Sequence, residues 1–349
     1  MTRLDPQSVA RNDGNPSVRE VRGASLRKGG APLEANTRIR WKGYLLSISG
    51  GILWAAAGAC GQALFRNNTV TSTWLVPIRL LLAGLIFLLL SGISSSGVFR
   101  IWKDRNAVLR LLLCAVFGVA ASQFTFYGCI EAANVAFSTV MCYICPVFIL
   151  VYTILREKRK PRLYETAGVL LVVTGVFSCA THFDLSRLWV PADALILGLL
   201  CGLSAAVNTL SPITLNKRFG VLPVLGWSML IGGAAMTALF RPWRIHPTVN
   251  GQLIGFMSVI ILGGTVVAFG AYMRGIQLVG PVAAVVLSAA EPVTAVILSA
   301  LVLHVTFTPY DLLGFLTILL TIPVISIGQQ RESVPPPSAE RSKRKEAAP

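Results

Sequence analysis

One pattern of residues occurs twice in this chain at a fixed distance. The first copy holds Pro146, Tyr164, Glu165 and Gly168, and the second holds, 146 residues later, Pro292, Tyr310, Asp311 and Gly314. A constant offset over such a stretch indicates internal duplication, and a duplication limits the folds that a chain can adopt. The fold is therefore expected to consist of two similar units.

The repeated stretches are apolar, which indicates membrane spans. Hydrophobic residues make up 54% of the chain, charged residues only 13%, and the mean hydropathy is +0.67. These values lie outside the usual range of soluble domains. The runs are continuous rather than alternating, so they predict helices and not barrel strands. The ten expected helices cover residues 43–65, 73–92, 107–127, 134–155, 164–182, 192–212, 221–240, 251–273, 282–303 and 309–328.

Ten spans divide into five per copy, and five is an odd number. The second copy must therefore enter the bilayer from the opposite face. We expect an all-α integral membrane protein of ten transmembrane helices, built as two inverted five-helix repeats over residues 43–182 and 192–328. Inverted repeats offer two pseudo-equivalent conformations, one open to each side, as alternating access requires.

The net charge of +16 has to be located before it is interpreted. With the N-terminus inside, all but five of the 31 basic residues fall on the cytoplasmic side. The exceptions are Arg66, Arg187, Arg241 and Arg244 outside, and Arg79 within a span. This bias follows the positive-inside rule, and no aromatic residues interleave the basic runs as in a nucleic-acid surface. We expect both termini in the cytoplasm, a lipid bilayer around the protein, and no nucleic-acid partner.

The two ends of the chain are polar. Residues 1–42 begin with a stretch rich in Arg, Gly, Asn and Ser that lacks the apolar run of a signal peptide, and residues 329–349 contain a Pro-rich and a basic segment. Both are expected to be disordered cytosolic tails. The role of the N-terminal tail stays open.

The cysteines do not suggest chemistry. Their number is seven, all in or beside apolar spans, so a disulfide framework is not expected. Cys142 and Cys145 form a C-x-x-C, but there is no second pair, and the three histidines stand singly near span ends. Thiols are common packing residues in apolar surroundings. We expect no metal site and no cofactor.

The duplicated prolines are candidate hinges. Pro146 and Pro292 fall inside the fourth and ninth spans, where each removes one backbone hydrogen bond. The carbonyls four residues earlier, at Cys142 and Ser288, then need another partner, which can be water, a side chain or a substrate. The alternative is a simple kink that fits the helix around its neighbours.

Polar residues deep in the spans are candidate substrate ligands, because each is costly in hydrocarbon unless it faces the bundle interior or a wet cavity. The candidates are Trp54, Gln62, Gln123, Tyr143, Asn208, Ser288 and Glu291. For each of them a hydrogen bond between helices is the alternative role. On the first span, a second face of small residues, which includes Gly51 and Ala55, is expected to be helix-packing surface.

Two ionisable residues within the spans differ in depth. Glu291 lies about halfway along the ninth span, where a charged carboxylate requires a cation or a donor to compensate for lost water. This suggests proton coupling or recognition of an amine, and the alternative is a neutral acid bonded to a neighbouring helix. Arg79 lies about two turns into the second span, within reach of the surface, so we expect it to anchor the helix at the interface.

The chain resembles members of the drug/metabolite transporter superfamily, in its EamA branch of ten-span proteins, by the order and spacing of several short apolar stretches. The matching stretches start at Gly51, Ile78, Ala132, Gly226 and Ala289, and the likeness runs from about residue 43 to 328. The resemblance implies a transporter with both termini cytosolic and a central cavity between its halves. Cys145-Pro146 stands where members of the family often have Glu-Pro.

The sequence therefore predicts a secondary transporter of a small organic metabolite, such as an amino acid, an amine, a carboxylate or a drug-like compound, in the cell (inner) membrane. Export is favoured over uptake. The alternatives are a nucleotide-sugar or lipid-linked carrier, and a membrane assembly factor or enzyme that does not transport. An enzyme is not expected, because clustered His, Asp or Glu at span ends is missing. The substrate, the coupling ion and the choice between monomer and homodimer stay open.

Overall fold

The computed structural model describes residues 33–66, 70–94, 97–184 and 186–333. The expectations for residues 1–32 and 334–349 lie outside the described residues. Within the described ranges the fold is all-α, and ten helices are long and apolar enough to cross a membrane. The expected fold class, an all-α protein of ten spans, is confirmed.

The helices follow the expected order, and several extend beyond their apolar stretch. The first five spans are α2 (Leu33–Arg66), α3 (Ser72–Ser94), α4–η2–α5 (Arg105–Leu113, Cys114–Ala120, Ala121–Ala132), α6–α7 (Val135–Cys142, Cys145–Glu157) and α8 (Leu163–Thr181). The second five are α9 (Ala192–Leu210) with its continuation α10 (Ile213–Phe219), α11 (Val221–Phe240), α12–η4–α13 (Gly251–Ser258, Val259–Val267, Ala268–Val279), α14–α15 (Pro281–Ser288, Ala290–Leu301) and α16 (Pro309–Ser333). Short 3₁₀ turns, η1 (Arg100–Lys103) and η3 (Pro242–Arg244), lie in two loops.

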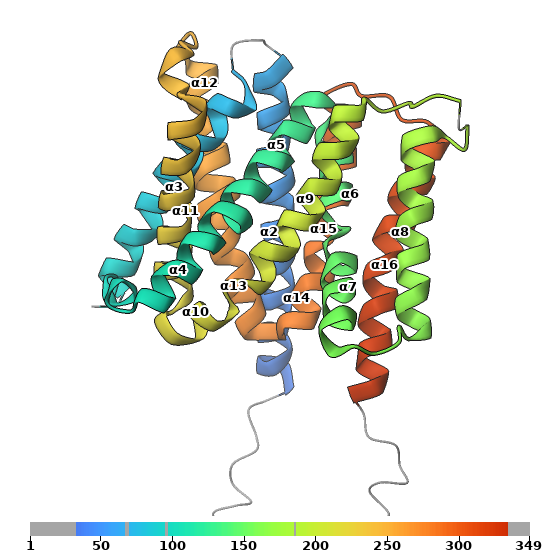
Figure 1. Ribbon diagram of the computed structural model, residues 1–349, viewed down its shortest axis with the longest axis horizontal. Helices are drawn as coiled ribbons and strands as arrows, with labels where there is room; N and C mark the ends of the chain where they lie inside the picture. Colours follow the sequence, from blue (N-terminus) through green and yellow to red (C-terminus); the bar gives the residue numbers. More distant parts are fainter. Residues whose placement is uncertain (1–32, 67–69, 95–96, 185, 334–349) are drawn as a thin grey trace, which may run out of the picture.

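The first helix begins earlier than expected. Helix α2 starts at Leu33, whereas the apolar run starts near residue 43. Its first turns are therefore helical although their sequence is polar. Helix α2 begins and α16 ends at the same end of the bundle (Figure 1), which we call the terminal end; the opposite end is the distal end.

Interruptions of the helices repeat with the same 146-residue offset. The third and eighth spans each contain a π-helical stretch, η2 and η4. The fourth span breaks at Tyr143 and Ile144, and the ninth breaks at Ala289. Tyr143 and Ala289 are 146 residues apart. Because π-helical turns and broken helices are frequent at functional sites, these repeated irregularities direct attention to the middle of the bundle.

The packing of α8 against α16 also repeats with this offset. A Cβ atom at Gly168 would meet Thr321 and Ile325, while one at Gly314 would meet Gly175 and Cys179. The two contacts are related by the repeat. Gly314 is the counterpart of Gly168, and Gly175 and Cys179 are the counterparts of Thr321 and Ile325, each 146 residues away. The two helices run antiparallel, because contacts that advance along α8 recede along α16.

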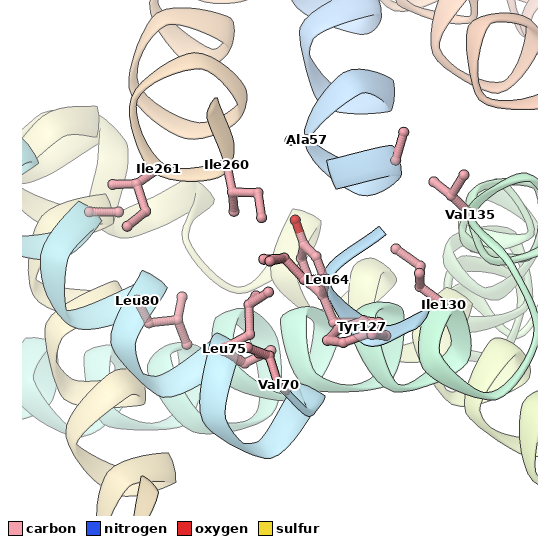
Figure 2. Close-up of a cluster of buried hydrophobic side chains, with 14 of the residues drawn as sticks. Ala57, Leu64, Val70, Leu75, Leu80, Tyr127, Ile130, Val135, Ile260 and Ile261 are labelled. Carbon is pink, nitrogen blue, oxygen red and sulfur yellow. The ribbon is translucent and has the colours of Figure 1, made fainter. Parts of the chain in front are cut away.

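A core of large apolar side chains joins α2, α3, α5 and η4 around Tyr127 of α5. Figure 2 shows Tyr127 among Leu64 of α2, Leu75 of α3 and Ile130 of its own helix, with Ile260 of η4 nearby. Tyr127 is 1% exposed. This core fixes the positions of the helices that surround the candidate site.

Side-chain caps begin the third and eighth spans at corresponding positions. Asp104 accepts hydrogen bonds from the backbone N–H groups of Asn106 (3.0 Å) and Ala107 (3.2 Å), and Asn250, 146 residues later, accepts one from Leu253 (2.8 Å). Such caps satisfy N–H groups that a helix start leaves unpaired. The Ala107 N–H and the paired guanidinium of Arg218 hold the pKa of Asp104 below its ordinary value.

Replacing Gly175 by Ala is expected to lower the thermal stability of the detergent-solubilised protein. The added Cβ would lie 2.8 Å from the Gly314 carbonyl oxygen and 2.5 Å from the Ile318 side chain, and a backbone oxygen cannot yield cheaply. Overpacking of this kind costs about 1–3 kcal/mol. The matched control is Gly255→Ala, because a Cβ at Gly255 meets no atom of the described residues within 4 Å, apart from its chain neighbours and its own helix backbone. Equal melting temperatures for the two variants would contradict this account of the α8–α16 contact.

Candidate functional site

A cavity of about 170 Å³ lies between the helices of both halves, and four of the seven candidate ligands line it. Those four are Trp54 of α2, Gln123 of α5, Asn208 of α9 and Glu291 of α15. The remaining lining residues are Ala57, Arg79, Ser122, Phe126, Tyr127, Cys142 and Ala205. Residues that are distant in the sequence therefore meet at one place, at the level of the helix breaks.

Glu291 reaches this cavity from the first turn of α15, directly after the break in the ninth span. The Tyr143 hydroxyl lies 3.3 Å from Glu291 Oε2 and 3.2 Å from the Ser288 carbonyl oxygen, and it can donate its single proton to either. The freed Ser288 carbonyl thus finds a side-chain partner, as the sequence predicts. The Ser288 hydroxyl itself donates to Val285 in its own helix, at 2.9 Å.

Tyr143 and Ser288 therefore adjoin the cavity through Glu291 rather than by lining it. Close packing holds this arrangement, since a Cβ at Gly51 of α2 would lie 2.7 Å from the Ser288 carbonyl oxygen and 3.0 Å from the Glu291 nitrogen. Only glycine allows α2 to approach the break so closely. The small-residue face of the first span is packing surface, as expected, with Gly51 and Ala55 buried.

Arg79 does not reach the membrane interface, and the expectation that it anchors α3 there is wrong. Arg79 is 7% exposed and lines the central cavity. Its Nε donates to Thr265 Oγ1 at 3.1 Å, its Nη1 donates to Gln123 Oε1 at 2.6 Å, and its guanidinium lies 4.9 Å from the centre of the Tyr127 ring. The face of α3 that carries Arg79 points into the bundle, where two acceptor oxygens and an aromatic ring take the place of water around the guanidinium.

Gln62 lies away from the cavity. Its Oε1 accepts a hydrogen bond from the Val135 backbone N–H at 2.8 Å, at the start of α6. The residue is 2% exposed, and its Nε2 has no hydrogen-bond partner among the residues that the structure describes. This contact is a hydrogen bond between two helices, which is the alternative role considered for each polar candidate. Substrate binding by Gln62 stays a prediction.

The two hinge candidates lie just after the breaks. Pro146 is the second residue of α7, and Pro292 is the third residue of α15. In the first turn of a helix the missing N–H of proline has no intrahelical partner to lose, so the prolines fit a helix start better than a kink within a continuous helix. Each span is therefore two half-helices joined at an irregular residue. Motion at these positions stays a prediction.

A larger cavity, of about 600 Å³, lies at the terminal end between α7, α8, α14 and α16. Pro146 lines it, together with the charged residues Glu157, Arg159, Arg162 and Glu165. Arg159 binds both oxygens of Glu165, at 2.6 and 2.7 Å, and also pairs with Glu157 at 2.7 Å. These hydrogen bonds raise the pKa of Arg159, with Glu165 the main cause. The acidic groups here are already paired, so the smaller central cavity is the better candidate for a substrate.

Sequence reasoning missed several residues that line the central cavity, above all Arg79 and Cys142. One signal was present: an arginine among apolar residues in a span usually faces the interior. No group of three His, Cys, Asp or Glu that could hold a metal ion occurs among the residues that the structure describes.

Cysteine labelling is expected to distinguish the cavity wall from the packed core. In a chain whose seven native cysteines are replaced by alanine, Ala205→Cys should react with a small hydrophilic thiol reagent, because Ala205 lines the cavity. The matched Ala136→Cys variant should stay unreactive, since Ala136 is 0% exposed. Reaction at neither position, in protein that is still folded, would mean that water does not enter the assigned cavity.

The profile of the EamA-like transporter family matches the chain twice, at residues 41–181 and 193–327. The uncharacterized inner membrane transporter YicL of Salmonella typhimurium is 34% identical over 292 residues, which cover 84% of this chain and 97% of that protein. The uncharacterized transporter YwfM of Bacillus subtilis is 24% identical over 291 residues, covering 82% and 95%. A solved crystal structure shares the fold at a TM-score of 0.51 and 15% identity, covering 86% of this chain and 99% of its own.

Proposed function

Because the chain belongs to the EamA-like transporter family, we propose that it is a secondary transporter that moves a small organic metabolite across the membrane by alternating access. The observation that carries this proposal is the central cavity. Helices of the first half contribute Trp54, Arg79 and Gln123 to its wall, and helices of the second half contribute Asn208 and Glu291. A polar site at the junction of two repeats is where secondary transporters bind their substrates.

The repeated irregularities support alternating access. Two half-helices meet in the fourth span and two in the ninth, at positions 146 residues apart, and both breaks adjoin the cavity through Tyr143 and Ser288. Helices α8 and α16 are repeat counterparts, they pack antiparallel, and each presents the equivalent residues to the other. This arrangement is consistent with two halves that are inverted relative to each other. Such halves can rock about a fixed site and open it to each side in turn.

The orientation of the chain follows from its charges and its relatives. The basic residues cluster in the loops at the terminal end, where positive charge favours the cytoplasm. A relative is named an inner membrane transporter, which supports a multi-pass protein of the cell (inner) membrane with both termini cytoplasmic.

The contacts at the distal end support a conformation that is closed on that side. The Arg66 side chain of α2 donates to the Leu303 carbonyl oxygen after α15, and His182 at the end of α8 lies 3.0 Å from Asp311 of α16. The larger cavity lies at the opposite, terminal end. In the proposed orientation, a protein that rests in this state receives its substrate from the cytosol, which is the first step of export.

Glu291 is the residue that we assign to proton coupling. It is the acidic residue among those that line the central cavity, and Tyr143, its hydrogen-bond neighbour beside the cavity, is neutral. A proton and a cationic group of the substrate would compete for the same carboxylate. Competition for one site exchanges the substrate for a proton, which would drive export against a gradient.

Counterflow in proteoliposomes tests the proposed transport. Thermal-shift screening of the purified protein against amino acids, amines and carboxylates identifies a ligand, since binding to the folded state alone raises the melting temperature. Vesicles loaded with that ligand in unlabelled form should then transiently accumulate the labelled form. Protein-free vesicles are the control. A ligand that binds but is never exchanged would contradict the proposal.

Replacing Glu291 by Gln is expected to abolish the response of transport to an imposed proton gradient, because an amide does not titrate in this range. Counterflow at equal pH should be weaker but still measurable at raised ligand concentration, because the amide oxygen can still accept a hydrogen bond from the substrate. The matched control is Asp193→Asn, an exposed acidic residue at the start of α9. Within the described part of the chain, its side chain bonds only to the neighbouring Ala194 nitrogen. Transport by the Glu291→Gln variant that still follows the proton gradient would remove Glu291 from the coupling mechanism.

A further inference from the structure

The central cavity is lined by one basic and one acidic side chain that do not pair with each other. Arg79 and Glu291 both line it, and neither belongs to an ion pair among the residues that the structure describes, although pairs within 4.0 Å occur elsewhere in the chain. The positive charge comes from α3 in the first half and the negative charge from α15 in the second. The space between them belongs to the cavity.

The bonds of Arg79 leave its charge without a countercharge. A guanidinium has five N–H donors, and the two hydrogen bonds to Thr265 and Gln123 occupy two of them. Both partners are neutral, and so is the Tyr127 ring beside the guanidinium. The geometry therefore holds the guanidinium in place and leaves donors for an anionic group, which such a planar fork binds with two parallel hydrogen bonds.

Glu291 is held in the same manner. Its Oε2 faces the Tyr143 hydroxyl at 3.3 Å, a long contact that Tyr143 shares with the Ser288 carbonyl. Its Oε1 has no hydrogen bond among the described residues and is left for a donor that enters the cavity. A charged carboxylate at this depth is costly unless a cation accompanies it.

One kind of solute supplies both missing partners. We propose that the cavity binds a small zwitterion of the α-amino-acid type, with the carboxylate on Arg79 and the ammonium group on Glu291. This assignment rests on the proposed function and names its substrate class. An amine would leave Arg79 buried without a countercharge, which is strongly destabilising. An acid without an amino group would leave Glu291 without a cation, so that Glu291 would have to take up a proton to avoid an unpaired charge. The zwitterion adds no net charge to the bundle.

The shape of the site agrees with such a substrate. The cavity volume of about 170 Å³ lies below the range of about 300–1,000 Å³ that is usual for drug-sized ligands. Trp54, Phe126 and Ala205 provide an apolar wall next to the two charges, where the side chain of the solute can lie. A nucleotide sugar or a lipid-linked solute does not match this volume.

Matched ligand sets test the proposal on the unmodified full chain. Alanine, leucine and phenylalanine are compared with the amines that lack the carboxylate and the acids that lack the amino group, by thermal shift and calorimetry in detergent. At least one amino acid should bind, and both of its single-charge analogues should bind at least about ten-fold more weakly, because each lacks one of the two charged contacts. Equal binding of an amine or an acid, or binding of none of the three amino acids, would overturn the proposal.

Variants of Arg79 assign the carboxylate contact. The Arg79→Gln variant should bind the amino acid about as weakly as the wild-type protein binds the corresponding amine, and its affinity for the amine should not fall further. Such non-additivity is the signature of two groups in direct contact. The matched control is Arg244→Gln, an exposed arginine in η3, which should bind all ligands as the wild type does. Additive losses in Arg79→Gln would place the carboxylate elsewhere.

The Arg79→Lys variant covers the case in which the glutamine variant does not fold. It keeps the charge and loses the planar fork, so it should bind the amino acid more weakly than the wild type while still preferring it over the amine. Unchanged affinity in this variant would also count against the contact.

Failure of the transport proposal gives a different result: an amino acid binds with this selectivity but shows no counterflow. The converse result is also distinguishable. If the protein binds no amino acid but exchanges a solute with one charge or none, the zwitterion proposal is wrong and the transport proposal is supported.

Discussion

The need to satisfy polar groups in a medium without water controls this structure. Each helix bonds its own backbone, so the chain crosses the membrane as helices, and any interruption must find partners inside the bundle. The interruption before α15 does so, because Tyr143 donates toward the Ser288 carbonyl and Gly51 lets α2 close over it. The same requirement turns Arg79 inward, where Gln123 and Thr265 receive its N–H groups. Polar groups thus converge at one level of the bundle, and there the cavity forms.

The proposals for function all depend on this convergence. Alternating access needs a site between two parts that can move relative to each other, and the two charges of the cavity belong to different halves. In the proposed mechanism a zwitterion joins Arg79 of the first half to Glu291 of the second. Binding would thereby couple the solute to the relative position of the halves, which is the link that a carrier requires. A proton at Glu291 would compete with the ammonium group, so loading and proton release become one exchange.

Much of the fold could be predicted from the sequence, and about half of the site. The expected spans agree closely with the observed helices, because apolar runs in lipid leave the backbone few alternatives. Their ends were less predictable: α2 starts at Leu33, and the last turns of α5 and α13 continue past their apolar residues, since helices also extend into water when neighbours support them. Trp54, Gln123, Asn208 and Glu291 meet in the cavity, whereas Gln62 bonds to α6. A polar residue at a similar depth can face either a cavity or a neighbouring helix, and hydropathy alone does not separate the two.

The sequence by itself determined the membrane environment, the ten helices and the 146-residue repeat, because these follow from composition and from residue spacing along one chain. Only the tertiary structure decided the direction in which each polar side chain points. Arg79 looked close enough to the surface to reach it, and the packing of α3 against α5 and η4 directs it to Tyr127 and Gln123 instead. The tertiary structure also decided that Arg79 and Glu291, which are 212 residues apart in the sequence, share one cavity without pairing. The rotation of each helix about its own axis depends on contacts with all its neighbours, and no single helix contains that information.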